Sequence, residues 1–151
     1  MVTTPGPPPT GPGSVAVLLA MLGRRVREEI DAALEPLDLS MRHLSALGHL
    51  TRRPGVSYSE LARRAGITVQ SLQATLRRLE ELGAVERRGE PGRGRVAELH
   101  VTPAGRRLLG TAEKAVAGVE QVMLASLPRP ERVLLTRTLV GMVGRLGDGP
   151  G

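Results

Sequence analysis

The chain has 151 residues, no cysteine, and a single aromatic residue, Tyr58. This composition excludes disulfides, thiol chemistry and cysteine-rich zinc sites, and it argues against RNA-binding platforms that stack bases on aromatic side chains. The net charge is +6. Segment 52–107 holds the whole excess, because it contains 12 Arg against 6 Glu while the other residues balance. Such a local basic excess is typical of a polyanion-binding module, and a solvated basic surface is the alternative.

The first 13 residues read MVTTPGPPPTGPG, and the dominance of Pro and Gly predicts a disordered tail over 1–13. No apolar run approaches the roughly 20 residues needed to cross a bilayer, and we expect no signal peptide. We therefore expect a cytoplasmic protein without membrane contact. Apolar residues at helical spacing then predict a first helix over 15–36, which Pro36 ends.

Three shorter helices are predicted over residues 41–51, 58–65 and 69–82. Ser40 is a suitable N-cap for the first of them. Ser57 and Glu60 have the spacing of a capping box at the start of the second, and Thr68 is the expected N-cap of the third. Gly66 can take the left-handed conformation that closes a helix, so the second and third helices are joined by a tight turn.

A basic hairpin and two long helices complete the chain. Short strands are predicted over 84–87 and 96–101, with a projecting Gly- and Pro-rich loop between them. Thr102-Pro103 then opens a fifth helix, since Thr is a good N-cap and Pro fits the first helical position. Leu127-Pro128 ends that helix, and a sixth follows to about Leu146.

Two helices joined by a tight turn and followed by a basic hairpin have the layout of a winged helix-turn-helix, whose second helix enters the major groove of DNA. The fold class is therefore mainly α with a small β-hairpin wing. The apolar residues of the 69–82 helix, Val69, Leu72, Leu76 and Leu79, lie on one face. Its polar face carries the candidate reading residues Gln70, Ser71, Gln73, Ala74, Arg77 and Arg78. Gln and Ser suit base edges, whereas Arg77 and Arg78 suit phosphates. Arg93 and Arg95 near the loop tip suit a narrow minor groove, and a solvated charged loop is the alternative.

The sequence resembles the MarR family, the multiple antibiotic resistance regulators. The likeness rests on Leu61-Ala62, on the run from Leu79 to Arg87, and on Leu99-His100-Val101-Thr102-Pro103-Ala104-Gly105, which match a progression of family motifs in order and spacing. The family also carries an Asp-x-Arg pair near the tip of the wing. Its Arg falls on Arg95, but Arg93 stands where the Asp is expected, so the resemblance implies a wing without that brace.

The resemblance implies a homodimer on double-stranded DNA, with a winged helix-turn-helix over 37–103 inside a single domain over 14–147. The dimerisation helices would then be 14–36 and 104–147. The apolar stripes of these helices exceed what one small core covers, which favours a dimer independently, and a monomer with helices wrapped around its core is the alternative.

The resemblance also implies a small-molecule effector in a cleft between the dimerisation helices and the DNA-binding part. His43 would lie near this cleft, and Arg24, Arg27 and Arg42 would face it. A neutral His43 that packs or caps locally is the alternative. Because the three histidines lack companions at metal-ligand spacing, and because no phosphate loop or nucleophile elbow occurs, we expect no metal site, no cofactor and no enzymatic activity.

Three hypotheses remain open. The first is a sequence-specific repressor or activator that binds a near-palindromic operator and responds to a ligand. The second is an architectural protein that binds DNA with little sequence preference. The third is a helical interaction module with a degenerate DNA-binding part. The ratio of affinities for operator and random DNA separates the first two.

Overall fold

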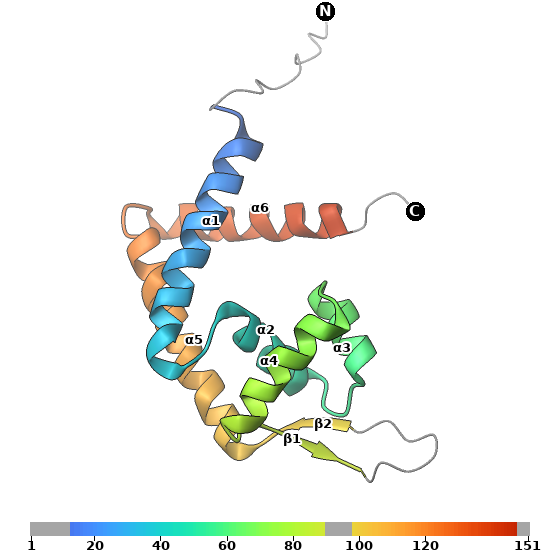
Figure 1. Ribbon diagram of the computed structural model, residues 1–151. Coiled ribbons are helices and arrows are strands. Elements are labelled where there is room, and N and C mark those ends of the chain that lie inside the picture. The colour runs from blue at the N-terminus through green and yellow to red at the C-terminus, as the bar shows by residue number, and fades with distance from the viewer. Residues whose placement is uncertain (1–12, 90–97, 148–151) are drawn as a thin grey trace, which may run out of the picture. The chain divides into compact units, whose positions relative to one another are not determined.

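The computed structural model describes residues 13–89 and 98–147 and divides the chain into two compact units, the first ending at Val116 and the second beginning at Ala117. Residues 1–12 of the expected tail and 90–97 of the expected wing loop lie outside the described residues. The elements in chain order are α1 (Val15–Leu34), η1 (Glu35–Leu37), α2 (Met41–Arg52), α3 (Tyr58–Ala65), α4 (Val69–Glu81), β1 (Val85–Arg88), β2 (Glu98–Val101), α5 (Pro103–Met123) and α6 (Arg129–Gly147). The predicted fold class, mainly helical with one hairpin, is confirmed (Figure 1).

Several predicted boundaries differ from those observed, most of them by one residue. The first helix ends at Leu34, because the chain continues through Pro36 as a 3₁₀ turn. The first strand starts at Val85, one residue later than predicted. The fifth helix ends at Met123, where the amide of Leu127 turns back to bond the carbonyl of Leu124 at 3.0 Å. The proline at 128 therefore follows a turn that has already closed the helix.

The first unit is built around leucine. Its strands pair antiparallel, with Val85 opposite Val101 and Arg88 opposite Glu98. The helices α2, α3 and α4 pack against one another, and α2 also contacts β2. The largest fully buried side chains are all leucines, namely Leu34, Leu47, Leu50, Leu61, Leu72, Leu76, Leu79 and Leu99. A core of this kind follows from a chain with one aromatic residue.

The start of α5 is tied to the start of the hairpin through Thr102. The Thr102 hydroxyl donates to the carbonyl of Gly83 at 2.6 Å and accepts from the amide of Gly105 at 3.0 Å, which confirms the predicted cap. The Thr102 amide donates to the carbonyl of Ala84 at 3.0 Å. Gly105 is buried here, and a Cβ atom on it would overlap the Ala84 carbonyl oxygen and lie 2.8 Å from Cγ1 of Val101. This close approach requires glycine.

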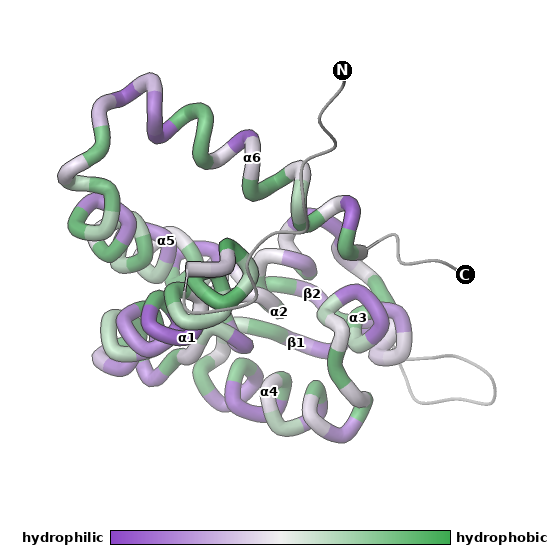
Figure 2. Tube along the Cα trace, turned by 90° about the horizontal axis from the view of Figure 1, so that it is seen from above, coloured by the Kyte–Doolittle hydropathy of each residue, from purple (hydrophilic) through white to green (hydrophobic). Residues whose placement is uncertain are grey.

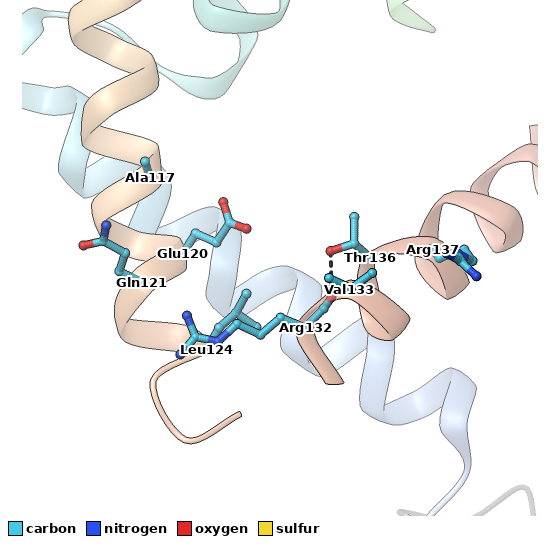
Figure 3. A pocket seen from close by; sticks show the side chains of 8 residues that line it. All are labelled: Ala117, Glu120, Gln121, Leu124, Arg132, Val133, Thr136 and Arg137. Carbon is cyan, nitrogen blue, oxygen red and sulfur yellow. Dashed lines mark hydrogen bonds between the residues drawn. The ribbon is translucent and has the colours of Figure 1, made fainter. Parts of the chain in front are cut away.

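The second unit contains the last part of α5 and all of α6. No residue of α6 over 129–146 is buried, and Val133, Leu134, Val140, Val143 and Leu146 are each more than half exposed. Figure 2 shows apolar residues recurring along α6 between polar ones. Between the two helices of this unit lies an open hollow lined by Glu120, Leu124, Arg132 and Thr136 among others (Figure 3). This unit therefore leaves much of its apolar surface uncovered.

Candidate nucleic-acid interface

The turn between α3 and α4 has the geometry that the sequence predicts. Gly66 adopts a left-handed conformation with φ 64°, and its amide bonds the carbonyls of Ala62 and Arg63 at the end of α3. Thr68 then caps α4, since its hydroxyl accepts the amide of Ser71 at 3.2 Å. The glycine at 66 and the threonine at 68 therefore set where α3 ends and where α4 begins.

Four of the predicted reading residues share the outer face of α4. Gln70, Gln73, Ala74 and Arg77 are all exposed, while Leu72, Thr75, Leu76 and Leu79 are buried on the opposite face. This separation follows the helical repeat of 3.6 residues. Arg77 has no carboxylate within ion-pair distance among residues 13–89 and 98–147. A solvent-facing strip of two amides and one unpaired guanidinium is chemically suited to base edges and phosphates.

The other two predicted reading residues have partners inside the protein. Ser71 is half-buried, and its hydroxyl accepts the Thr68 hydroxyl at 3.0 Å. Arg78 lies 3.3 Å from the carboxylate of Asp38 and 3.3 Å from that of Glu81. Asp38 has a left-handed backbone at φ 55°, which Asp tolerates better than most residues, and it follows the 3₁₀ turn after α1. Arg78 thus links α4 to the segment that follows α1 rather than facing outwards.

Two predicted details at the edge of this surface also differ. Val69, expected on the buried face of α4, is 41% exposed, so the first turn of the helix is only partly covered. Only half of the expected capping box forms at α3. The Glu60 amide donates to the Ser57 hydroxyl at 3.3 Å, but the Glu60 carboxylate binds Arg63 and Arg64 instead of returning to the cap.

The charge on α3 is largely internal. Hydrogen bonds from Arg63 and Arg64 lower the pKa of Glu60 to about 2, so this carboxylate stays ionised through the neutral range. Because Arg63 and Arg64 both bind Glu60, neither arginine of α3 is without an ion-pair partner. On α4 itself, Arg77 is the arginine without a carboxylate in ion-pair distance among the described residues, since Arg78 pairs with Asp38 and Glu81.

Sequence reasoning missed a cluster that joins α3, α4 and β1. The Arg87 guanidinium donates to both oxygens of Glu80, at 2.5 and 3.2 Å, and lies 5.2 Å from the centre of the Tyr58 ring. Burial raises the pKa of Tyr58, the nearby Arg87 charge opposes this rise, and the Tyr58 hydroxyl is buried without a hydrogen-bond partner among the described residues. The family motif from Leu79 to Arg87 contained two members of the cluster, but its spacing does not show that they meet.

The wing tip was predicted to carry Arg93 and Arg95, and both lie outside the described residues. At the described base of the hairpin, Glu86 pairs with Arg88 at 2.6 Å, and Glu98 lies 3.1 Å from the ring of His100. The minor-groove role of the two tip arginines stays a prediction.

The predicted effector residues differ in burial, and their role at a ligand site stays a prediction. Arg24, Arg27 and Arg42 are exposed. His43 is half-buried and lines an open hollow with Asp31, Glu35, Asp38 and Arg78. Three carboxylates against one guanidinium make this lining unfavourable for an anion. The local alternative for His43 describes its contacts better, because Nδ1 accepts the Ser40 amide at 2.9 Å and also lies 2.9 Å from the Ser40 hydroxyl.

The cap on α2 requires a neutral His43, since a protonated Nδ1 has no lone pair for the Ser40 amide. Burial, and then the charges of Arg78 and Arg42, lower the pKa of His43, while Asp31 opposes them. Among residues 13–89 and 98–147, no three His, Asp or Glu side chains are grouped as metal ligands. No described helix has the length and apolar character of a membrane span.

Comparison with known proteins identifies the chain. The model of the MarR family matches residues 37–96. The HTH-type transcriptional repressor Rv2887 of Mycobacterium tuberculosis is 38% identical over 131 residues, which cover 87% of this chain and 91% of that protein. The chain belongs to the MarR family. The resemblance inferred from the sequence motifs is thereby confirmed.

Solved structures of MarR-family proteins share the fold. Rv2887 in complex with DNA superposes with a TM-score of 0.74 at 34% identity, covering 86% of this chain and 98% of that one. The same protein in complex with salicylic acid gives a TM-score of 0.70 at 35% identity, covering 86% and 96%. The repressor CouR bound to a 23-mer DNA duplex gives 0.76 at 28% identity, covering 89% and 99%. The family is one of transcriptional regulators.

Proposed function

We propose that this MarR-family chain is a sequence-specific DNA-binding repressor that works as a homodimer on a near-palindromic operator. The observation that carries the proposal is the exposed strip of Gln70, Gln73, Ala74 and Arg77 on α4, the helix that follows the tight turn. The DNA complex of the mycobacterial relative, which spans nearly the same length, supports the assignment. The reading residues are then these four, together with Arg93 and Arg95 at the wing. The role is regulatory rather than enzymatic, and we expect it to be carried out in the cytoplasm.

The homodimer accounts for the apolar surface left on α1 and α6. Val15, Leu18, Met21 and Leu22 near the start of α1 are each at least half exposed, and the exposed residues of α6 belong to the same class. Covering such side chains is worth about 25 cal/mol per Å² of apolar area, so a second copy is a favourable partner. The division into a reading part over 37–103 and dimerisation helices over 14–36 and 104–147 is part of this proposal. Sedimentation equilibrium of the full chain measures the state directly, and a monomer at micromolar concentration would contradict it.

Selection of bound sequences from a random duplex library, at one stated salt concentration, tests the DNA-binding function. A two-fold symmetric dimer places two α4 helices in successive major grooves, so we expect half-sites about 34–36 Å apart. An enriched palindrome with that spacing supports the repressor. Binding without an enriched motif supports the architectural alternative, and absence of binding supports the interaction module.

A small aromatic acid is the effector class that we propose, on the basis of the mycobacterial relative's complexes with salicylic acid and p-aminosalicylic acid. The acidic hollow beside His43 is by itself a poor place for its carboxylate. The ligand-site role of His43, Arg24, Arg27 and Arg42 stays a prediction. Titration of salicylate into the protein–operator complex, followed by gel shift, tests the effector alone. Failure to release DNA would remove the effector from the proposal and leave the repressor intact.

A further inference from the structure

Arg87 is positioned to hold the wing against the reading helix. It extends from β1, donates two hydrogen bonds to Glu80 on α4 and lies over the ring of Tyr58 on α3. The first of these contacts is bidentate, which fixes the plane of the guanidinium as well as its distance. The second places the guanidinium carbon 5.2 Å from the centre of an aromatic ring, where a cation is attracted by the ring face. One side chain thus contacts both helices of the helix-turn-helix from the strand that leads into the wing.

The surroundings of this cluster connect it to the reading surface. Tyr58, Glu80 and Arg87 line one hollow together with Val69, Gln73 and Arg77 of α4. Gln73 and Arg77 belong to the exposed strip assigned to DNA. A change in the position of Arg87 therefore alters the wall beside two of the proposed reading residues and, through β1, the direction in which the wing leaves the domain.

An isolated exposed ion pair contributes little to stability, and the side chains of Arg87 and Glu80 are 53% and 26% exposed. The value of this pair lies in orientation instead, because it supplies the side-chain hydrogen bonds that the described residues show between α4 and the hairpin. Strand β1 also lies in contact with α4. Fixing a short hairpin before DNA arrives lowers the ordering cost of binding.

We propose that Arg87 is a positioning residue for DNA recognition, and that the Glu80–Arg87–Tyr58 cluster sets the angle between the wing and the reading helix. This inference rests on the proposed DNA-binding function. In the free protein, the Arg87 guanidinium is already hydrogen-bonded to Glu80 and is not available to a DNA phosphate. Its contribution to affinity is therefore made through the placement of the wing.

Removal of the Glu80 charge separates this proposal from simple electrostatics. Glu80→Gln deletes a negative charge near the DNA, so a purely electrostatic role predicts tighter binding. Positioning predicts weaker binding, by about three- to tenfold at fixed salt, which is the range for losing one oriented charge pair. Glu86→Gln is the matched control. Glu86 is an exposed carboxylate on β1, the strand that carries Arg87, and its ion-pair partner Arg88 belongs to neither α3 nor α4. We expect the control to bind as tightly as wild type or slightly more tightly.

The salt dependence of binding tests the role of Arg87 itself. Loss of one direct phosphate contact lowers the slope of log affinity against log salt by about 0.9. We expect Arg87→Gln to weaken binding to the selected operator while leaving this slope unchanged, and to do so with an unfolding midpoint close to that of Glu86→Gln. A slope lowered by about one phosphate, or a Glu80→Gln protein that binds like its control, would overturn the proposal.

Amide hydrogen exchange on the free protein gives a readout that needs no DNA. We expect faster exchange over β1 and β2 in Glu80→Gln and in Tyr58→Leu, and wild-type rates in Tyr58→Phe, which keeps the ring and loses only a hydroxyl that has no described partner. Unchanged exchange in Glu80→Gln would refute the cluster's hold on the wing even if wild type bound no DNA. The opposite result is also informative. If the variants show the faster exchange over β1 and β2 but the wild-type protein binds no DNA, only the proposed DNA-binding function is refuted.

Discussion

Substitution of Gly105 by alanine tests the close contact between α5 and the hairpin. Two effects of opposite sign meet at this position. Alanine is a better helix former than glycine by up to about 1 kcal/mol, which favours the variant. Against this, the new Cβ would overlap the Ala84 carbonyl oxygen and lie 2.8 Å from Cγ1 of Val101. Backbone is the obstacle, so rotation of a side chain cannot relieve the overlap.

The unfavourable effect is the larger of the two. Overpacking in a well-packed site costs about 1–3 kcal/mol. Displacing the Ala84 carbonyl also weakens the bond that it accepts from the Thr102 amide at 3.0 Å, which is worth about 1 kcal/mol. After the helix-propensity gain of Gly105→Ala is subtracted, we expect a net loss of about 1–3 kcal/mol in the free energy of unfolding. For a chain of this length, each kcal/mol lowers the thermal midpoint by about 2–4 °C.

Urea and thermal unfolding followed by circular dichroism measure this loss, with all variants at one protein concentration, because oligomer stability depends on concentration. Gly110→Ala is the matched control. Gly110 lies in the same helix, and a Cβ there meets nothing within 4 Å, so only the propensity gain of up to about 1 kcal/mol applies. The two variants should therefore shift stability in opposite directions. A Gly105→Ala protein as stable as Gly110→Ala would show that this contact does not constrain the fold.

Three further predictions concern α2, α4 and the reading strip. His43→Gln keeps the residue type of a capping box without a titrating group. The pKa of His43 is lowered in the folded state, so the unfolded state binds its proton first, and wild type should lose stability as pH falls below about 6.5. The variant should lose less in unfolding titrations at pH 7.5 and 5.5, and equal losses would show that His43 protonation is not coupled to folding. Thr68→Ala should cost about 1 kcal/mol of unfolding free energy by removal of the α4 cap, and no change in urea midpoint would contradict the assignment. Gln73→Ala should relax base preference more than it weakens binding to random DNA, as a repeat of the library selection would reveal, and an unchanged motif would mean that Gln73 reads no base.

The element order was predictable because the signals that set helix ends are local. The caps at Thr68 and Thr102 accept amides three residues ahead, and the Gly66 amide bonds carbonyls three and four residues back, so their identity and spacing are enough to place α4, α5 and the end of α3. Buried positions of α4 followed from its apolar repeat for the same reason. The repeat extends across the whole helix, however, and does not reveal that Val69 in the first turn stays 41% exposed.

Partners that come from distant segments were not predictable. Helical periodicity places Arg78 on the polar side of α4 without showing that Asp38, forty residues earlier, lies next to that side. The same holds for Arg87, whose two partners belong to α3 and α4. The bond between His43 and Ser40 is local, by contrast, and agrees with the alternative of a neutral His43 that caps locally.

The isolation of Tyr58 makes the chain its own spectroscopic reporter. With no tryptophan and no phenylalanine, near-ultraviolet absorption and fluorescence arise from this one ring. The ring lies where α3 meets the Arg87 guanidinium, beside the hollow that contains Gln73. A change in its emission on adding duplex, once corrected for absorption by the duplex itself, therefore reports the junction of wing and reading helix without a label.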